Sequence, residues 1–196
     1  MAAKKDTLLN MFIAMFVICV VSGSILGLVY NATKDPIAAA ETAKKTEAIK
    51  NVLPEFNELK ETMVKSAMED AEIPFYLAYD ANNNFIGAAV ETFTNKGFSG
   101  NISLMVGILA NGTINNISVL QHAETPGLGS KMSESSFKDQ FNNKNTTSFN
   151  FNVKKDGGDV DAITASTITS RAYADGVALA VKVFQAIGQT PMPIND

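Results

Sequence analysis

A long uncharged segment near the start of the chain constrains the fold more than any other feature. Residues 8–30 contain no Asp, Glu, Lys or Arg, and their clearly polar side chains are Asn10, Ser22 and Ser24. A helix rising about 1.5 Å per residue over this length can cross the roughly 30 Å hydrocarbon core of a bilayer. We therefore expect one transmembrane helix at residues 8–30, after a short N-terminal tip at residues 1–7.

A cleavable signal peptide is the alternative interpretation of this segment. Lys4 and Lys5 precede it, and the alanines at 38–40 resemble the small residues of a cleavage site. The apolar region of a signal peptide usually spans about 7–15 residues, which is shorter than the segment found here. The length therefore favours an anchor that stays in the membrane.

Charge alone does not decide the orientation of the expected span. Lys4, Lys5 and the terminal amine favour a cytosolic N-terminus, because positive charge collects on the cytosolic side. Three further lysines lie within reach on the other side of the span, so the two sides nearly balance. They are Lys34, Lys44 and Lys45.

Composition limits the chemistry that the chain can support. The 196 residues have a net charge of −4 and show no basic patch, so nucleic-acid binding is not expected. The single cysteine is Cys19 and the single histidine is His122. One cysteine excludes an intrachain disulfide and an iron–sulfur cluster held by this chain alone, and one histidine argues against a histidine-based metal site. We expect no bound metal, so a redox role would require an organic cofactor.

The remaining sequence predicts an α+β domain, an antiparallel sheet with helices packed against it, at residues 75–196. A helical connector at residues 31–74 precedes it, with the helix at 33–53 ending before Pro54. Asn111-Gly112 is a strong hairpin signal, and Asn82 to Asn84 form a second expected turn. The strands are expected at residues 75–81, 85–93, 102–109 and 114–120. Helices are expected at 130–142 and 167–187, with a short strand at 148–153 in the polar loop between them.

The segment Asp161-Ala162-Ile163-Thr164-Ala165-Ser166-Thr167-Ile168-Thr169-Ser170 stands directly before the last amphipathic run. It places several hydroxyl groups where a helix is expected to begin. Free backbone N–H groups and the positive end of the dipole favour an anion at such a position. An ordinary cluster of capping residues is the alternative.

A second segment, His122-Ala123-Glu124-Thr125-Pro126-Gly127-Leu128-Gly129, has the character of a loop. Pro126 fixes φ, while Gly127 and Gly129 permit positive φ and close backbone approach. Such a loop can lay its N–H groups against a flat heterocycle. On its own it also fits a plain Pro-Gly turn.

Together, these two segments resemble signatures of the flavin-carrying subunits of Rnf and Na⁺-pumping NADH:quinone oxidoreductase complexes. The first resembles the Asp-x-x-Thr-Gly-Ala-Thr sequence whose last threonine, here Thr167, is esterified with FMN. Ala165 replaces the usual Gly and Ser166 the usual Ala. The likeness covers nearly the whole chain, most specifically from Gly97 onward, and is greatest to the G subunit of the Rnf complex.

The resemblance implies FMN attached through its phosphate to Thr167 by a separate flavin transferase, with Asp161 helping that enzyme to recognise the segment. Thr164 and Ser170 would hydrogen-bond the phosphate or ribityl chain. The residues bordering the ring system would be Glu124, Thr125, Gly127 and Leu128, with a hydrogen bond from Thr125. Leu128 would supply an apolar contact. The implied cofactor-binding residues are Glu124, Thr125, Gly127, Leu128, Gly129, Thr164, Ala165, Thr167, Ile168, Thr169 and Ser170. His122 is open to either a structural or a flavin-tuning role.

As a whole, the resemblance implies a single-pass protein of the cell membrane with its flavin domain outside the cytosol. It would relay electrons within an ion-translocating ferredoxin:NAD⁺ oxidoreductase, beside the other subunits of that complex. We expect no catalytic residue in this chain, since other subunits handle ferredoxin and NAD⁺. The alternatives are the matching subunit of the quinone reductase, another extracytosolic flavin relay, and a membrane-anchored binding module without flavin.

Overall fold

The computed structural model describes residues 8–65 and 72–188 and comprises two compact units, residues 1–43 and residues 44–196. The first unit consists of most of helix α1 (Leu8–Val52), which runs without a break through Pro36. The apolar side chains of its N-terminal part are exposed. Among the described residues α1 is the one helix long and apolar enough to cross a membrane.

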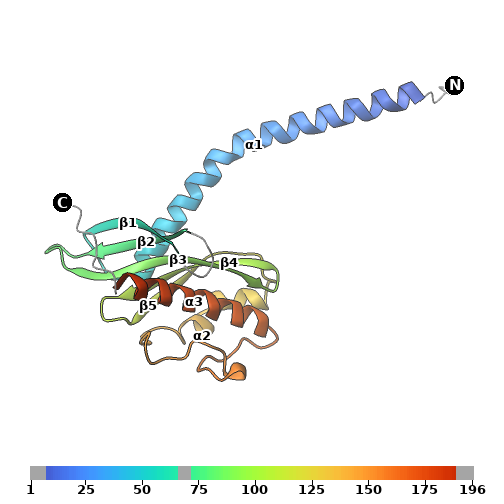
Figure 1. Ribbon diagram of the computed structural model, residues 1–196. Helices are drawn as coiled ribbons and strands as arrows, with labels where there is room; N and C mark the ends of the chain where they lie inside the picture. The colour runs from blue at the N-terminus through green and yellow to red at the C-terminus, as the bar shows by residue number, and fades with distance from the viewer. Residues whose placement is uncertain (1–7, 66–71, 189–196) are drawn as a thin grey trace. The chain divides into compact units, whose positions relative to one another are not determined.

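The second unit is built on a five-stranded antiparallel sheet whose strands are neighbours in the order of the chain (Figure 1). Each strand pairs with the next through a short connection, so the sheet is a simple meander. The strands are β1 (Glu58–Lys65), β2 (Glu72–Tyr79), β3 (Phe85–Gly97), β4 (Gly100–Leu109) and β5 (Ile114–His122). The α+β class and the antiparallel sheet predicted from the sequence are confirmed.

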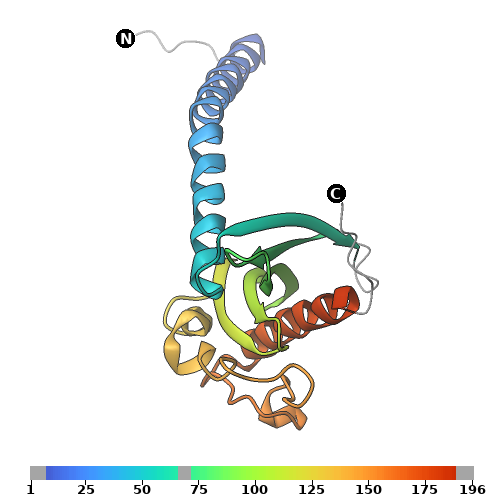
Figure 2. The same ribbon diagram turned by 90° about the vertical axis from the view of Figure 1, so that its left-hand side faces the viewer.

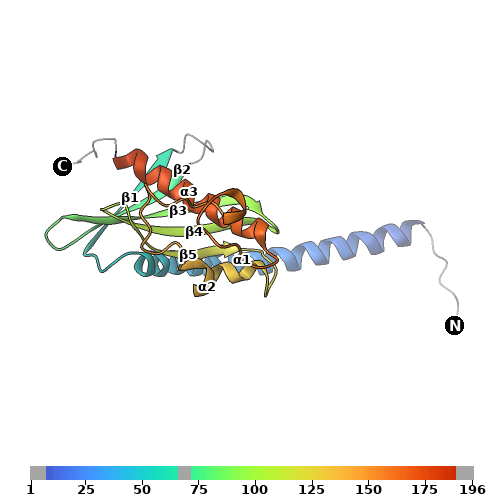
Figure 3. The same ribbon diagram turned by 90° about the horizontal axis from the view of Figure 1, so that it is seen from below.

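Alternation along the central strands gives the sheet two apolar faces. In β4, Leu104 and Val106 point to one face and Met105 points to the other. Helix α3 (Thr167–Gly188) covers the first face along β3 and β4, and the last turns of α1 cover the second (Figure 3). This arrangement follows from the period of two in a strand, which sends neighbouring side chains to opposite sides.

Close approach explains two glycines in this core. A Cβ on Gly107 would collide with the carbonyl group of Val52 at the end of α1. On the opposite face, a Cβ on Gly176 would lie 3.0 Å from Leu104 Cδ1, and the Gly176 carbonyl accepts a 3.0 Å hydrogen bond from Thr92. Gly176 therefore permits tight packing between α3 and the sheet.

The helix expected to end before Pro54 ends there, but the helical connector expected at residues 31–74 also contains a strand. Helix α1 ends at Val52, and β1 follows as an edge strand whose side chains are almost all exposed. The Glu and Lys residues of β1 are good helix formers, and its sequence shows no clear alternation of apolar and polar residues, so the sequence does not indicate a strand there. Charged side chains on an edge strand also discourage pairing with other chains.

The segment after β5 is less helical than its sequence predicts. In place of one helix over residues 130–142 there are two short ones, η1 (Gly129–Ser133) and α2 (Ser135–Lys138). Serine hydroxyls compete for backbone hydrogen bonds, and Asn143 adopts a φ of 59°. The expected inward side chains are nevertheless buried: Met132, Phe137 and Phe141.

An irregular loop, residues 139–166, connects α2 to α3. The strand expected at residues 148–153 is absent from it, and only a single bridge joins Val153 to Val160. A short helix, η2 (Lys154–Asp156), lies within this loop. In Figure 2 the loop, coloured orange, lies at the end of the domain where α3 begins.

Candidate functional site

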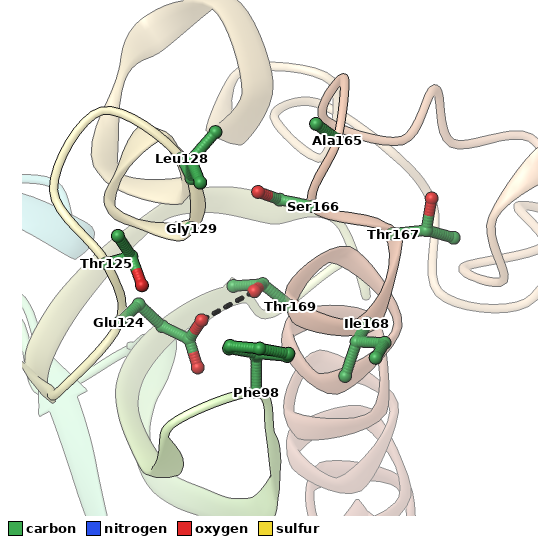
Figure 4. Close-up of a pocket in the computed structure, with 10 residues that line it drawn as sticks. All are labelled: Phe98, Glu124, Thr125, Leu128, Gly129, Ala165, Ser166, Thr167, Ile168 and Thr169. Carbon is green, nitrogen blue, oxygen red and sulfur yellow. Dashed lines mark hydrogen bonds between the residues drawn. The ribbon is translucent and has the colours of Figure 1, made fainter.

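A cavity of about 360 Å³ opens beside the first turn of α3. Three segments that are distant in the sequence form its walls: the turn between β3 and β4, the loop after β5, and the start of α3 (Figure 4). Its volume lies within the usual range for small-molecule sites, about 300–1,000 Å³. The lining residues are Phe98, Glu124, Thr125, Leu128, Gly129, Ala165, Ser166, Thr167, Ile168 and Thr169.

The Glu124 carboxylate joins all three walls. Its side chain is buried, with only 5% of the residue exposed. One oxygen, Oε2, accepts a 2.7 Å hydrogen bond from the Thr169 hydroxyl, and the other, Oε1, accepts a 3.0 Å bond from the Ser99 N–H. Figure 4 shows the first of these bonds crossing between the loop and α3. Since a buried carboxylate needs such partners, Glu124 fixes the walls relative to one another.

Gly129 makes this junction possible. A Cβ at Gly129 would collide with Glu124 Oε2 and lie 2.8 Å from Thr169 Oγ1. The close backbone approach predicted for this glycine is therefore made to protein side chains. Glycine is favoured at Gly127 for a different reason. The space around it is open, but its φ is +76°. A side chain there would be opposed by the backbone conformation.

A tight turn leads into α3. Ala165 has a φ of 62°, in the left-handed region that glycine adopts most readily. The Ser166 N–H then donates to the Ile163 carbonyl at 3.0 Å. The Ser170 hydroxyl, which is fully buried, accepts from the Ile163 N–H and donates to the Ser166 carbonyl, each at 2.9 Å. These bonds hold the turn so that helix α3 begins at Thr167.

Thr167 lies at the outer edge of the cavity. Figure 4 shows its side chain on the far side of the α3 start from Glu124, whereas the Thr169 side chain points to Glu124. Thr167 is half-buried, and its hydroxyl lies 3.4 Å from Lys155 Nζ. Among the hydroxyl groups of this segment it therefore combines solvent access, a helix start and an adjacent cation.

Apolar side chains surround the cavity mouth. The exposed fractions are 68% for Phe98, 44% for Leu128 and 49% for Ile168. Exposed large apolar groups gathered at a cavity are typical of a site that receives a flat or apolar ligand. The sequence interpretation included Leu128 and Ile168 but missed Phe98 and Ser166. An aromatic residue inside the Gly97-Phe98-Ser99-Gly100 turn was the signal available for Phe98.

Three residues expected to bind the cofactor do not line the cavity. Gly127 and Thr164 are exposed outside it, and Ser170 is buried behind the helix start with its hydroxyl already bonded. Asp161 is exposed and pairs with Lys154 at 2.7 Å. His122 is also outside the lining, and its Nδ1 accepts a 3.2 Å hydrogen bond from the Glu124 N–H. This bond shapes the loop that carries Glu124.

An ion pair ties the irregular loop to α3 next to Thr167. Arg171 Nε and Nη2 donate to the two Asp156 oxygens at 2.6 and 2.7 Å. The Arg171 guanidinium lowers the pKa of the Asp156 carboxyl below its usual value, chiefly through these hydrogen bonds. This bidentate geometry restricts the Arg171 and Asp156 side chains more than a single hydrogen bond would.

Known proteins with similar sequences identify the family of the chain. Residues 97–182 match the family described as FMN-binding domain. The G subunit of the ion-translocating oxidoreductase complex of Aliivibrio fischeri is 35% identical, over 98% of this chain and 96% of that protein. The G subunit of the Na⁺-translocating ferredoxin:NAD⁺ oxidoreductase complex of Acetobacterium woodii is 31% identical, over 89% of this chain and 90% of that protein.

A solved structure is also similar. The crystal structure of Shewanella oneidensis NqrC is 20% identical, with a TM-score of 0.46 over 71% of this chain and 69% of that chain. The family is assigned from the two sequence relatives, because each is more than 30% identical to the chain over nearly its full length. The chain belongs to the family of G subunits of ion-translocating oxidoreductase complexes and contains an FMN-binding domain.

Proposed function

We propose that this protein is a membrane-anchored electron-transfer subunit of an ion-translocating ferredoxin:NAD⁺ oxidoreductase complex, with FMN esterified to Thr167. The family assignment and its FMN-binding domain support the redox role. The single observation that carries the attachment site is the position of Thr167. It is the first residue of α3, lines the cavity, and has its hydroxyl 3.4 Å from a lysine ammonium.

The competing hydroxyls are less suitable acceptors. Thr169 is buried and bonded to Glu124, and Ser166 is also buried. Ser170 uses its hydroxyl within the turn. Thr164 is exposed but lies outside the cavity lining. Among the hydroxyl groups of residues 164–170, Thr167 is thus the accessible one from which an attached group can enter the cavity.

The residues around the cavity suit the two ends of FMN. The free N–H groups at the start of α3 and the adjacent lysine favour a phosphate. Phe98, Leu128 and Ile168 offer apolar surface to a ring system, with Phe98 able to stack on it. Glu124 holds these walls in place through its bonds to Ser99 and Thr169.

Attachment requires a transferase and a donor of the FMN group. A threonine hydroxyl is a weak nucleophile, so a separate Mg²⁺-dependent enzyme would use FAD as donor. The Thr167 Oγ1 forms a new bond to the FMN phosphorus while the pyrophosphate bond of FAD breaks. AMP leaves and the hydroxyl proton passes to solvent. Asp161, which is exposed and paired with Lys154, would help that enzyme to recognise the segment.

When bound, FMN accepts electrons one or two at a time, which suits it to pass them between neighbouring redox centres. The protein's own contribution is to hold the cofactor at a defined place. Helix α1 would anchor the domain in the membrane, with the flavin domain outside the cytosol and the other subunits of the complex as partners. A covalent link prevents loss of the cofactor there.

Intact mass measured after co-expression with the transferase tests this function. The native chain should gain the mass of one FMN minus one water, and Thr167→Ala should gain nothing. Thr167→Ser retains the hydroxyl and should still be modified. Thr62→Ala, which removes an exposed hydroxyl in β1 outside the cavity lining, is the matched control and should be modified normally. Modification of Thr167→Ala would contradict the assignment, and an unmodified native chain would favour a binding module without flavin.

A further inference from the structure

A lysine distant in sequence lies beside the proposed attachment threonine. Lys155 Nζ donates to Thr167 Oγ1 at 3.4 Å, a long hydrogen bond between exposed groups. Lys155 belongs to η2 in the irregular loop, whereas Thr167 begins α3. The contact therefore depends on how the loop is folded against the helix.

Several features of the loop fix the position of Lys155. Gly157 ends η2 with a φ of +80°. At the adjacent Gly158, a Cβ would collide with the Asn152 carbonyl, so the loop closes on itself only with glycine there. The paired hydrogen bonds between Arg171 and Asp156 then fasten η2 to the first turns of α3.

The charged neighbours of Lys155 are engaged with other partners. Lys154, which precedes it in η2, forms an ion pair with Asp161 at 2.7 Å. Asp156, which follows it, is bound by Arg171 at 2.6 Å. The Lys155 ammonium is instead directed at the Thr167 hydroxyl. A group attached at that oxygen would therefore meet this cation first.

We propose that Lys155 is a positioning residue for the FMN phosphate. This inference rests on the proposed attachment at Thr167. Before attachment Lys155 donates to Thr167 Oγ1 and orients the hydroxyl. Afterwards it donates to a phosphodiester oxygen, since an ammonium has three donors and can serve more than one acceptor. The start of α3 supplies partial positive charge from the other side.

Phosphorus NMR of the attached protein tests the contact without measuring electron transfer. The flavin-carrying full chain would be compared with Lys155→Met, which keeps the aliphatic stem, and Lys155→Arg, which keeps the charge. The matched control is Lys60→Met in β1, which removes one exposed ammonium outside the cavity lining. We expect a displaced phosphodiester resonance in Lys155→Met, a smaller displacement in Lys155→Arg, and none in Lys60→Met.

The rate of attachment is the second measurement, followed by intact mass with purified transferase and FAD. We expect Lys155→Met to be slowed about fivefold, the factor that corresponds to the upper end of exposed ion pairs. Lys155→Arg and Lys60→Met should remain within about twofold of the native rate. Thermal unfolding of each unmodified variant checks that the loop still folds.

The outcomes separate this inference from the proposed function. A native chain that gains no flavin, or a Thr167→Ala chain that gains it, means that the proposed attachment has failed. If attachment is normal and abolished by Thr167→Ala, a Lys155→Met resonance matching the native one overturns the role of Lys155. The same conclusion follows if Lys60→Met displaces the resonance equally.

Discussion

At the scale of single residues, Ala165 carries a conformational cost beside the proposed attachment site. Its φ of 62° is in the left-handed region, where a Cβ costs roughly 1–2 kcal/mol relative to glycine. Replacing Ala165 by glycine would remove this strain and stabilise the fold. Glycine loses more conformational entropy on folding, however, which cancels part of the stabilisation. We expect Ala165→Gly to raise the free energy of unfolding by about 0.5–1 kcal/mol, measured by urea denaturation of the full chain in detergent.

Ala162→Gly is the matched control, because Ala162 precedes the same turn but does not have a positive φ. It should lower stability, because it adds freedom to the unfolded chain without relieving strain. Equal effects at the two positions would contradict the account of Ala165. The Gly expected at this position from the family sequence thus has a physical reason.

Thr169 supports the buried Glu124 carboxylate through one hydrogen bond. Its hydroxyl is the donor to a carboxylate oxygen of Glu124, inside the protein. Thr169→Val keeps the shape and removes the donor, leaving that oxygen without its partner. We expect a loss of about 1–3 kcal/mol in the free energy of unfolding. Thr169→Ser restores the hydroxyl and should recover most of the loss. Equal stability of the Val and Ser variants would show that the bond contributes little.

At the scale of secondary-structure elements, the sequence predicted those with a strong local pattern. Helix α3 was predicted within one residue of its end at Gly188, because its apolar period is clear. The turn at Asn111-Gly112 was also predicted, and Gly112 has a φ of +75°. Strand β1 was not predicted, because its place in the sheet depends on pairing with β2. The periodicity of one segment does not show which other segment it pairs with.

The candidate site follows the same rule. The loop after β5 and the start of α3 have recognisable local sequences and were predicted. Phe98 and Lys155 were not, because their roles arise from contacts with residues far along the chain. Ser170 was expected to face the cofactor, but its hydroxyl is taken by the turn. Local patterns therefore identify the segments of a site better than the direction of each side chain.

The end of α1 gives an element-scale prediction. Its last carbonyl groups lack partners within the helix, and Asn115 Nδ2 of β5 donates to the Val52 carbonyl at 2.9 Å. We expect Asn115→Ala to reduce the free energy of unfolding of the second unit by about 1 kcal/mol. Asn101→Ala, which removes an exposed amide bonded to another side chain, should have a smaller effect. A larger effect for Asn101→Ala would contradict the capping role.

At the scale of the whole molecule, the chain divides into an apolar helical unit and a unit that contains both cores and the cavity. The cavity is lined entirely by residues of the second unit. The FMN-binding domain and the helix that could cross a membrane thus occupy separate parts of the chain. Changes in the apolar part of α1 should accordingly affect location rather than the cofactor site.

We expect the second unit to lie on the extracytosolic side of the membrane. In a Cys19→Ala background, which removes the single cysteine, Ser136→Cys marks the exposed surface of α2 and Thr7→Cys marks the N-terminal tip. A membrane-impermeant maleimide applied to intact spheroplasts should label the Ser136→Cys chain. It should label the Thr7→Cys chain only after permeabilisation, because a flavin domain outside the cytosol places the other end of a single span in the cytosol. The reverse pattern would contradict the orientation. A mature chain from Thr7→Cys that takes no label even after permeabilisation and has lost its N-terminal mass would instead mean that the apolar segment is a cleaved signal peptide.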